Sequence, residues 1–127
     1  KPLVNVCMWA LTANTNEEAK YLFASRAAWK IGRNYGQLGS ITDPDNALSV
    51  INDNGWTEQY QNMYQNSLVG DANITKNKIS KLVEENNIDE IAILTWCHNE
   101  NHRIKSYEIF ANAFELSEKR EPEKSTI

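Results

Sequence analysis

The sequence predicts an α/β protein in which parallel strands are covered by helices. Two apolar segments, residues 3–11 and 91–97, have the composition of strands that are buried on both faces. Each is followed by a segment with apolar residues at positions i, i+3 and i+4, the pattern of an amphipathic helix. Strands that alternate with helices in this way form a parallel sheet, because the helices lie on the crossover connections.

The first predicted strand, residues 3–11, is interrupted only by Asn5. A helix is expected to begin near Asn16, because Thr15 and Glu18 have the spacing of a capping box. Gly32 follows the last apolar position of that helix and is the expected stop.

The sequence of residues 43–70 predicts two shorter helices and a short strand. Asp43 and Pro44 are a typical N-cap and first helical residue, so a helix is expected from there through Ile51. A second helix follows Gly55, and residues 67–70 suit a short strand. One face of this second helix carries an aromatic stripe made of Trp56, Tyr60, Met63 and Tyr64.

The last part predicts a helix, a strand and a final helix. Asp71 is expected to cap a helix that buries Ile74, Ile79, Leu82 and Val83. Residues 91–97 are the clearest strand, and a helix over about residues 100–117 is expected to bury Ile104, Tyr107, Phe110, Ala111 and Phe114. The charged residues 117–127 are expected to form a solvated tail.

Composition excludes several classes of protein. The 13 basic and 17 acidic residues give a net charge of −4, which argues against a nucleic-acid partner. The chain has no apolar run of about 20 residues for a membrane span and no basic start with an apolar segment for export, so a cytoplasmic protein is expected. Both cysteines, Cys7 and Cys97, lie in apolar segments and are expected to be reduced core residues.

Three side chains lie where α/β proteins usually bind ligands, at the carboxyl ends of parallel strands. Trp9 lies near the carboxyl end of the first strand, while Trp96 and His98 end or follow the last one. We therefore take Trp9, Trp96 and His98 as candidate pocket residues. Arg26 and Trp29 are spaced to form a cation–π or packing pair at the edge of their helix.

Two further patterns carry little chemical information. His98 and His102 are four residues apart, but Glu100 lies midway between them and no third ligand is evident, so we predict no metal site. Residues 69–72 have the composition of a phosphate-binding helix start or of a simple strand-to-helix turn. No catalytic nucleophile with an adjacent base is evident.

Short stretches in a characteristic order carry a family resemblance. They are residues 4–6, 13–19 (ANTNEEA), 25–29 (SRAAW), 36–39 (GQLG), 43–47 (DPDNA), 69–71 (VGD), 89–94 (DEIAIL) and 103–108 (RIKSYE). In this order and spacing, the chain resembles the luciferase-like flavin-dependent monooxygenases, the family of bacterial luciferase. The resemblance covers about residues 4–114 and corresponds to the C-terminal part of the family's domain.

The family fold is a (β/α)₈ TIM barrel of about 250 residues, so the resemblance implies that residues 1–116 supply roughly the last three βα units. Catalytic and cofactor-binding residues of the family lie in earlier units, so none is assigned here. The resemblance places Trp9, Trp96 and His98 at the mouth of the barrel. It also implies that Gly70 allows a tight turn after the penultimate strand. Asp71 and Ala72 replace the family's usual small residue and proline, which weakens a phosphate-binding role.

The resemblance implies a parent enzyme that uses FMN, reduced by NAD(P)H or a partner reductase, and dioxygen to oxidise a small organic substrate. The 127-residue chain alone is not expected to catalyse this reaction. It is expected to form a homo-oligomer or to associate with the rest of the barrel, because a small parallel sheet leaves two unpaired edges. The alternative is a non-catalytic α/β binding or self-associating module whose aromatic stripe is exposed for a partner.

Overall fold

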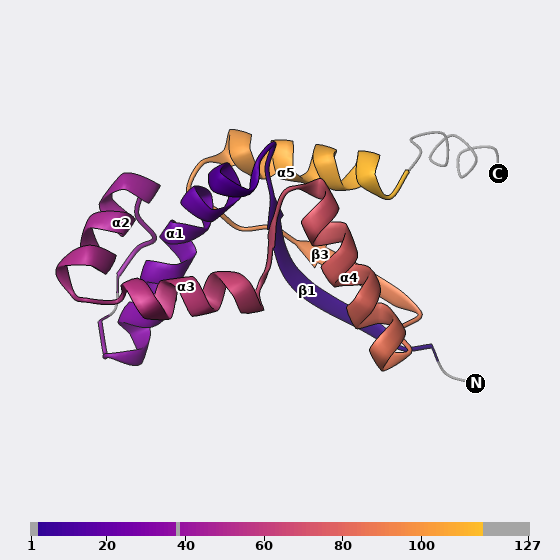
Figure 1. The fold of residues 1–127 in the computed structure, drawn as a ribbon, viewed down its shortest axis with the longest axis horizontal. Helices are drawn as coiled ribbons and strands as arrows, with labels where there is room; N and C mark the ends of the chain where they lie inside the picture. The colour runs from indigo at the N-terminus through magenta and orange to yellow at the C-terminus, as the bar shows by residue number, and fades with distance from the viewer. Residues whose placement is uncertain (1–2, 38, 116–127) are drawn as a thin grey trace.

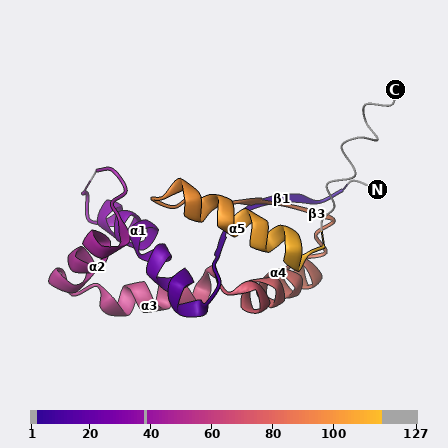
Figure 2. The same cartoon turned by 90° about the horizontal axis from the view of Figure 1, so that it is seen from above.

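The structure is a computed structural model that describes residues 3–37 and 39–115, and the predicted tail at residues 117–127 lies outside this part. The elements are β1 (Asn5–Thr12), α1 (Asn16–Asn34), α2 (Pro44–Asp53), α3 (Thr57–Asn66), β2 (Leu68–Gly70), α4 (Ala72–Asn86), β3 (Glu90–Leu94) and α5 (Glu100–Ala113). Helices α1 to α3 form one side of the molecule in Figure 1, which we call the helical lobe. Strands β1 and β3 form the other side with α4 and α5, and we call it the sheet lobe (Figure 2).

The sheet is parallel and has the strand order β2-β1-β3. Strand β3 pairs with β1 from Asn5↔Glu90 to Trp9↔Leu94, whereas β2 pairs only with the last three residues of β1. In a barrel of successive βα units, each strand lies beside the next one along the chain. The expectation of three successive units is therefore wrong: β1 and β3 are the neighbours, and β2 is a short addition at the end of β1.

Only one face of the sheet lobe is packed. Helices α4 and α5 cover the face that carries Ile91 and Ile93, and Ile79 and Phe110 fill the space between. The opposite face, which we call the open face, consists of exposed residues of β1 and β3: Asn5, Cys7, Glu90, Ala92 and Leu94. The prediction that both strands are buried on both faces is therefore wrong, except at the carboxyl end of β1.

The cysteines follow the same division of the molecule. Cys7 is exposed on the open face, so its predicted place in the core is wrong. Cys97 is half-buried against the core of the helical lobe. Both are free thiols, as the composition suggested.

Helix α1 begins where the sequence predicts. The Thr15 hydroxyl accepts a hydrogen bond from the Glu18 amide at 3.1 Å, and the Glu18 carboxylate accepts one from the Asn14 amide at 3.1 Å. The helix does not stop at Gly32, which is buried inside its last turn, but continues to Asn34. Helix α2 begins at Pro44 behind the Asp43 cap, as predicted.

The aromatic stripe belongs to the core of the helical lobe. Trp56 and Tyr60 are only 7% and 6% exposed, and the other two members of the stripe pack against the same core. The Tyr60 hydroxyl donates a hydrogen bond to the Lys20 carbonyl, and burial raises the pKa of Tyr60. The stripe is therefore not available to a partner, which removes the surface that the interaction-module hypothesis required.

The two covering helices show which faces the sequence misassigned. Asp71 caps α4 through the Ile74 amide at 2.9 Å, as predicted, but the Ile74 side chain is 37% exposed and Thr75 is buried in its place. In α5, Phe110 is buried as expected, whereas Ile104 is 48% exposed. No helix in the described part of the chain is long and apolar enough to cross a bilayer.

Candidate functional site

Four side chains meet near the carboxyl ends of β1 and β3. Trp9 comes from β1, Arg26 and Trp29 from α1, and Trp96 from the loop after β3. The Arg26 guanidinium carbon lies 4.3 Å from the ring centre of Trp9 and 5.9 Å from that of Trp96. The Trp96 ring meets Trp29 edge-on, with centres 5.2 Å apart. We call these four residues the Trp–Arg cluster.

Arg26 is the charged centre of this cluster. Its side chain is half-buried, and burial lowers the pKa of the guanidinium. Within the described residues, its contacts are to aromatic rings and no carboxylate pairs with it. The cation over the Trp29 ring is Arg33, at 4.8 Å, while Arg26 and Trp29 share Trp96 as a common neighbour.

Trp9 joins the cluster to the helical lobe. Its ring centre lies 5.6 Å from that of Phe23, and its indole Nε1 is buried with no hydrogen-bond acceptor among the described residues. Beside it is a cavity of about 300 Å³, whose polar lining is Arg26, Lys30, Asn66 and Ser67. The site thus combines aromatic walls with hydrogen-bond donors that lack acceptors.

The predicted pocket residues have different positions. Trp9 and Trp96 lie together in the cluster, while His98 is exposed and makes none of its contacts. Their assignment to a ligand pocket stays a prediction. Sequence reasoning did not find that Arg26 lies between the two tryptophans, because three distant segments bring these residues together.

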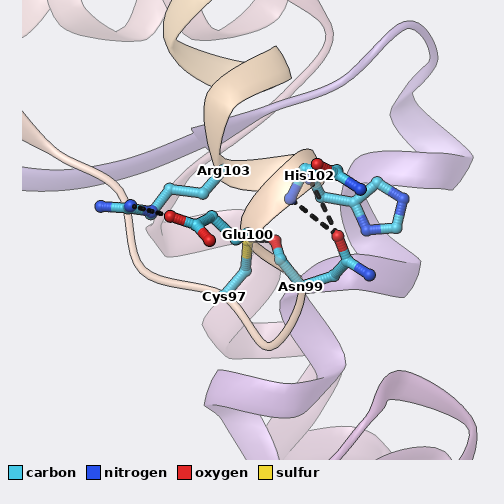
Figure 3. A network of polar contacts seen from close by, with 6 residues as sticks. Cys97, Asn99, Glu100, His102 and Arg103 are labelled. Atoms are coloured by element: carbon cyan, nitrogen blue, oxygen red, sulfur yellow. Dashed lines mark hydrogen bonds and ion pairs between the residues drawn. The ribbon is translucent and has the colours of Figure 1, made fainter.

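The segment from Cys97 to Arg103 forms the start of helix α5. The Asn99 side chain accepts hydrogen bonds from the backbone amides of Asn101 at 2.8 Å and His102 at 3.4 Å (Figure 3). Arg103 pairs with Glu100 at 3.2 Å, and Figure 3 shows the side chains of Glu100 and His102 on opposite sides of the helix. Among the described residues, no three His, Cys, Asp or Glu side chains come together to hold a metal ion.

The turn at residues 69–72 provides tight geometry and no free anion site. Gly70 has a φ of +154°, and a Cβ there would lie 2.7 Å from the Ile74 Cγ2 atom, so glycine is required at this turn. The Asp71 carboxylate accepts from the Ile74 amide, and the Asp71 amide donates to Asn16 at 2.7 Å. A phosphate at this helix start would have to displace the Asp71 carboxylate.

Comparisons with known proteins agree with the resemblance. No family model matches the chain. Two curated proteins named Luciferase-like monooxygenase, from Escherichia coli (strain K12) and Escherichia coli O6:H1, are 27% identical to it over 113 residues. The resemblance to luciferase-like monooxygenases is confirmed. The match covers 86% of this chain and 32% of those proteins, so the chain spans about a third of the luciferase-like relatives it matches.

A solved structure shows that the fold is shared. The crystal structure of apo-MsnO8 superposes with a TM-score of 0.78 at 18% identity. The superposition covers 92% of this chain and 36% of that one. The arrangement of the parallel strands and their helices is therefore also found within a protein chain almost three times as long as the matched part.

Proposed function

We propose that this chain is the C-terminal part of a luciferase-like oxidoreductase whose (β/α)₈ barrel is completed by strands and helices outside residues 1–127. The observation that carries the proposal is the open face of β1 and β3, which leaves apolar side chains without a covering layer. Cys7, Ala92 and Leu94 of this face would point into the barrel. The luciferase-like relatives, about three times the matched length, have enough chain to supply that layer.

The edges of the sheet support the same proposal. On the β2 side of β1, the ladder covers only Ala10 to Thr12, so residues 5–9 have no strand beside them in the described part of the chain. The outer edge of β3 is likewise unpaired in this part. Long unpaired edges are usually covered or paired in native proteins. A barrel that continues on both sides would pair both edges.

The proposed cofactor is FMN, with NAD(P)H or a partner reductase as the source of electrons. When bound in its reduced form, flavin supplies the reaction with dioxygen by which a small organic substrate is oxidised. The chain's own groups fit an aromatic ligand with an acceptor, because Trp96 is 36% exposed beside the Arg26 guanidinium, which pairs with no carboxylate among the described residues. In this proposal the two indoles orient the ligand and keep water away, while catalytic residues lie outside this chain.

The test is to purify the protein made from its native gene and to measure its intact mass and its absorbance spectrum. We expect a mass more than twice the 14.5 kDa of this chain, together with visible flavin absorption. In that protein, Trp96→Ala should reduce the bound flavin. Ile104→Ala, on the exposed side of α5, is the control and should not. A 14.5 kDa product that binds neither FMN nor another part of the barrel would overturn the proposal.

A further inference from the structure

Arg26 and Arg33 of α1 each lie over a tryptophan ring, but Arg26 is half-buried whereas Arg33 is exposed. Lys20 and Lys78 donate hydrogen bonds to Gln61 and to the Ser67 carbonyl, and Arg103 pairs with Glu100. Arg26 is half-buried, and within the described residues its guanidinium makes cation–π contacts with Trp9 and Trp96. Partly buried charges normally have a charged or hydrogen-bonding partner. Arg26 therefore has unused capacity for an acceptor.

The chemistry of that capacity follows from the guanidinium group. Contacts with ring faces use its positive charge and leave the N–H donors at its edge available. Those donors form a rigid fork that matches the two oxygens of a carboxylate or a phosphate. Arg26 keeps part of its surface in solvent, so an incoming ligand can reach it.

The cavity beside Arg26 has a matching character. Lys30 lies four residues further along α1 and lines the same cavity, which adds a second positive charge. The cavity has no acidic side chain in its lining, so the charge of Arg26 and Lys30 is not neutralised there. Phe23 and Met63 supply apolar walls. Positive charge, unsatisfied donors and apolar walls together suit a ligand with an anionic end and an apolar body.

We propose that the cavity between α1 and β1 binds the oxyanion of an organic ligand, a carboxylate or a phosphate monoester, through Arg26 and Lys30. The anion site itself does not depend on the proposed function, but the choice of FMN or a substrate as the ligand rests on it. The oxyanion would be the phosphate of FMN or the acidic group of a substrate. Both sources present the same chemistry to Arg26.

The test is a titration of the full chain monitored by tryptophan fluorescence, since Trp9 and Trp96 lie against Arg26. The probes are benzoate with its neutral analogue benzamide, inorganic phosphate, and FMN with its phosphate-free analogue riboflavin. We expect an anionic probe to bind more tightly than its neutral partner, and added salt to weaken that binding. Arg26→Gln should weaken it at least tenfold, and Arg26→Lys less. Arg33→Gln, on the same helix and over Trp29, is the matched control and should leave it unchanged.

The pairs of probes identify the source of the oxyanion. If FMN binds more tightly than riboflavin and Arg26→Gln removes the difference, the cavity holds the flavin phosphate. If benzoate exceeds benzamide while FMN and riboflavin bind equally, it holds an acidic substrate. The inference is overturned if no anion binds more tightly than its neutral partner, or if Arg26→Gln and Arg33→Gln have equal effects.

The folding of each variant is checked by circular dichroism. If Arg26→Gln does not fold, the affinity of Arg26→Lys and the salt dependence of binding decide whether Arg26 binds the anion. Flavin bound by the native gene product, with no preference for anionic probes, would leave the proposed function standing and remove only the Arg26 site.

Discussion

The helical lobe and the sheet lobe differ in how completely their apolar surfaces are buried. In the helical lobe, α1 alone contributes nine buried residues, and α2 and α3 pack their apolar faces against it. In the sheet lobe, the fully buried cluster consists of Ala10, Ile79 and Phe110, with partly buried residues around them. The helical lobe thus closes its own core, whereas the sheet lobe is packed on one side and open on the other.

The difference shows where the described residues leave apolar surface exposed. Apolar side chains are stabilised in proportion to the area that they remove from water. Leu94, the last residue of the edge strand β3, remains 54% exposed, although its strand has the apolar sequence of a fully buried one. The residues of β1 and β3 are suited to two covering layers, and the described chain provides one.

The largest expected effect is the loss of a core ring in the helical lobe. Phe23 is 1% exposed and packs between Trp9 and Tyr60, so Phe23→Ala should lower the free energy of unfolding by about 3–5 kcal/mol. Phe110→Ala, in the sheet lobe, should cost less because fewer buried groups surround it. Urea unfolding monitored by circular dichroism measures both values. Equal losses would contradict the contrast between the lobes.

The next effect concerns Gly70, at the junction between the lobes. Gly70→Ala should cost about 1–3 kcal/mol, because alanine at this φ is strained and its Cβ would lie 2.7 Å from Ile74 Cγ2. Adding Ile74→Ala relieves the contact but not the backbone strain, so the double variant should recover part of the stability. Thermal unfolding of both single variants and the double variant gives the coupling. A double variant that recovers nothing would show that the contact with Ile74 contributes nothing to the cost.

The sequence predicted features that depend on a few neighbouring residues. The caps Thr15, Asp43 and Asp71 were identified because a cap is recognised within four residues of chain. The buried faces were predicted less well: Thr75 rather than Ile74 faces the sheet, because the direction of α4 depends on tertiary packing. Strand composition also overstated burial, since it reflects the layers that a strand is suited to and not those the described chain supplies.

The candidate site shows the same limit. The sequence predicts Trp9 and Trp96 near the carboxyl ends of two strands, and the structure has them there, while their role in a ligand pocket stays a prediction. The position of Arg26 between them depends on how α1 passes the sheet, and no spacing in the sequence reports it.

A third prediction compares the stability effects of two substitutions at the contact between Thr12 and Ser106. The Thr12 amide donates to the Ser106 hydroxyl at 3.0 Å, and both residues are buried. Ser106→Ala should cost about 1–3 kcal/mol because it leaves that amide without its acceptor. The Thr12 hydroxyl is itself buried with no partner among the described residues, so Thr12→Val should gain up to about 1 kcal/mol. Chemical denaturation of both variants tests the opposite signs, and a loss in both would contradict this account.

The smallest effect on stability is expected at the open face, where the effect on association should be the larger one. Leu94 is 54% exposed, so Leu94→Thr should change the free energy of unfolding by no more than about 0.5 kcal/mol. If a second copy of the chain covers the open face when the rest of the barrel is absent, the same substitution should weaken self-association. Ile104→Thr is the matched control, because Ile104 is 48% exposed on α5, away from the open face. Sedimentation velocity over a range of concentrations separates the two variants. If the wild-type chain stays monomeric, or if both substitutions have equal effects, the open face does not drive association. The proposal that the rest of the barrel covers this face would then remain.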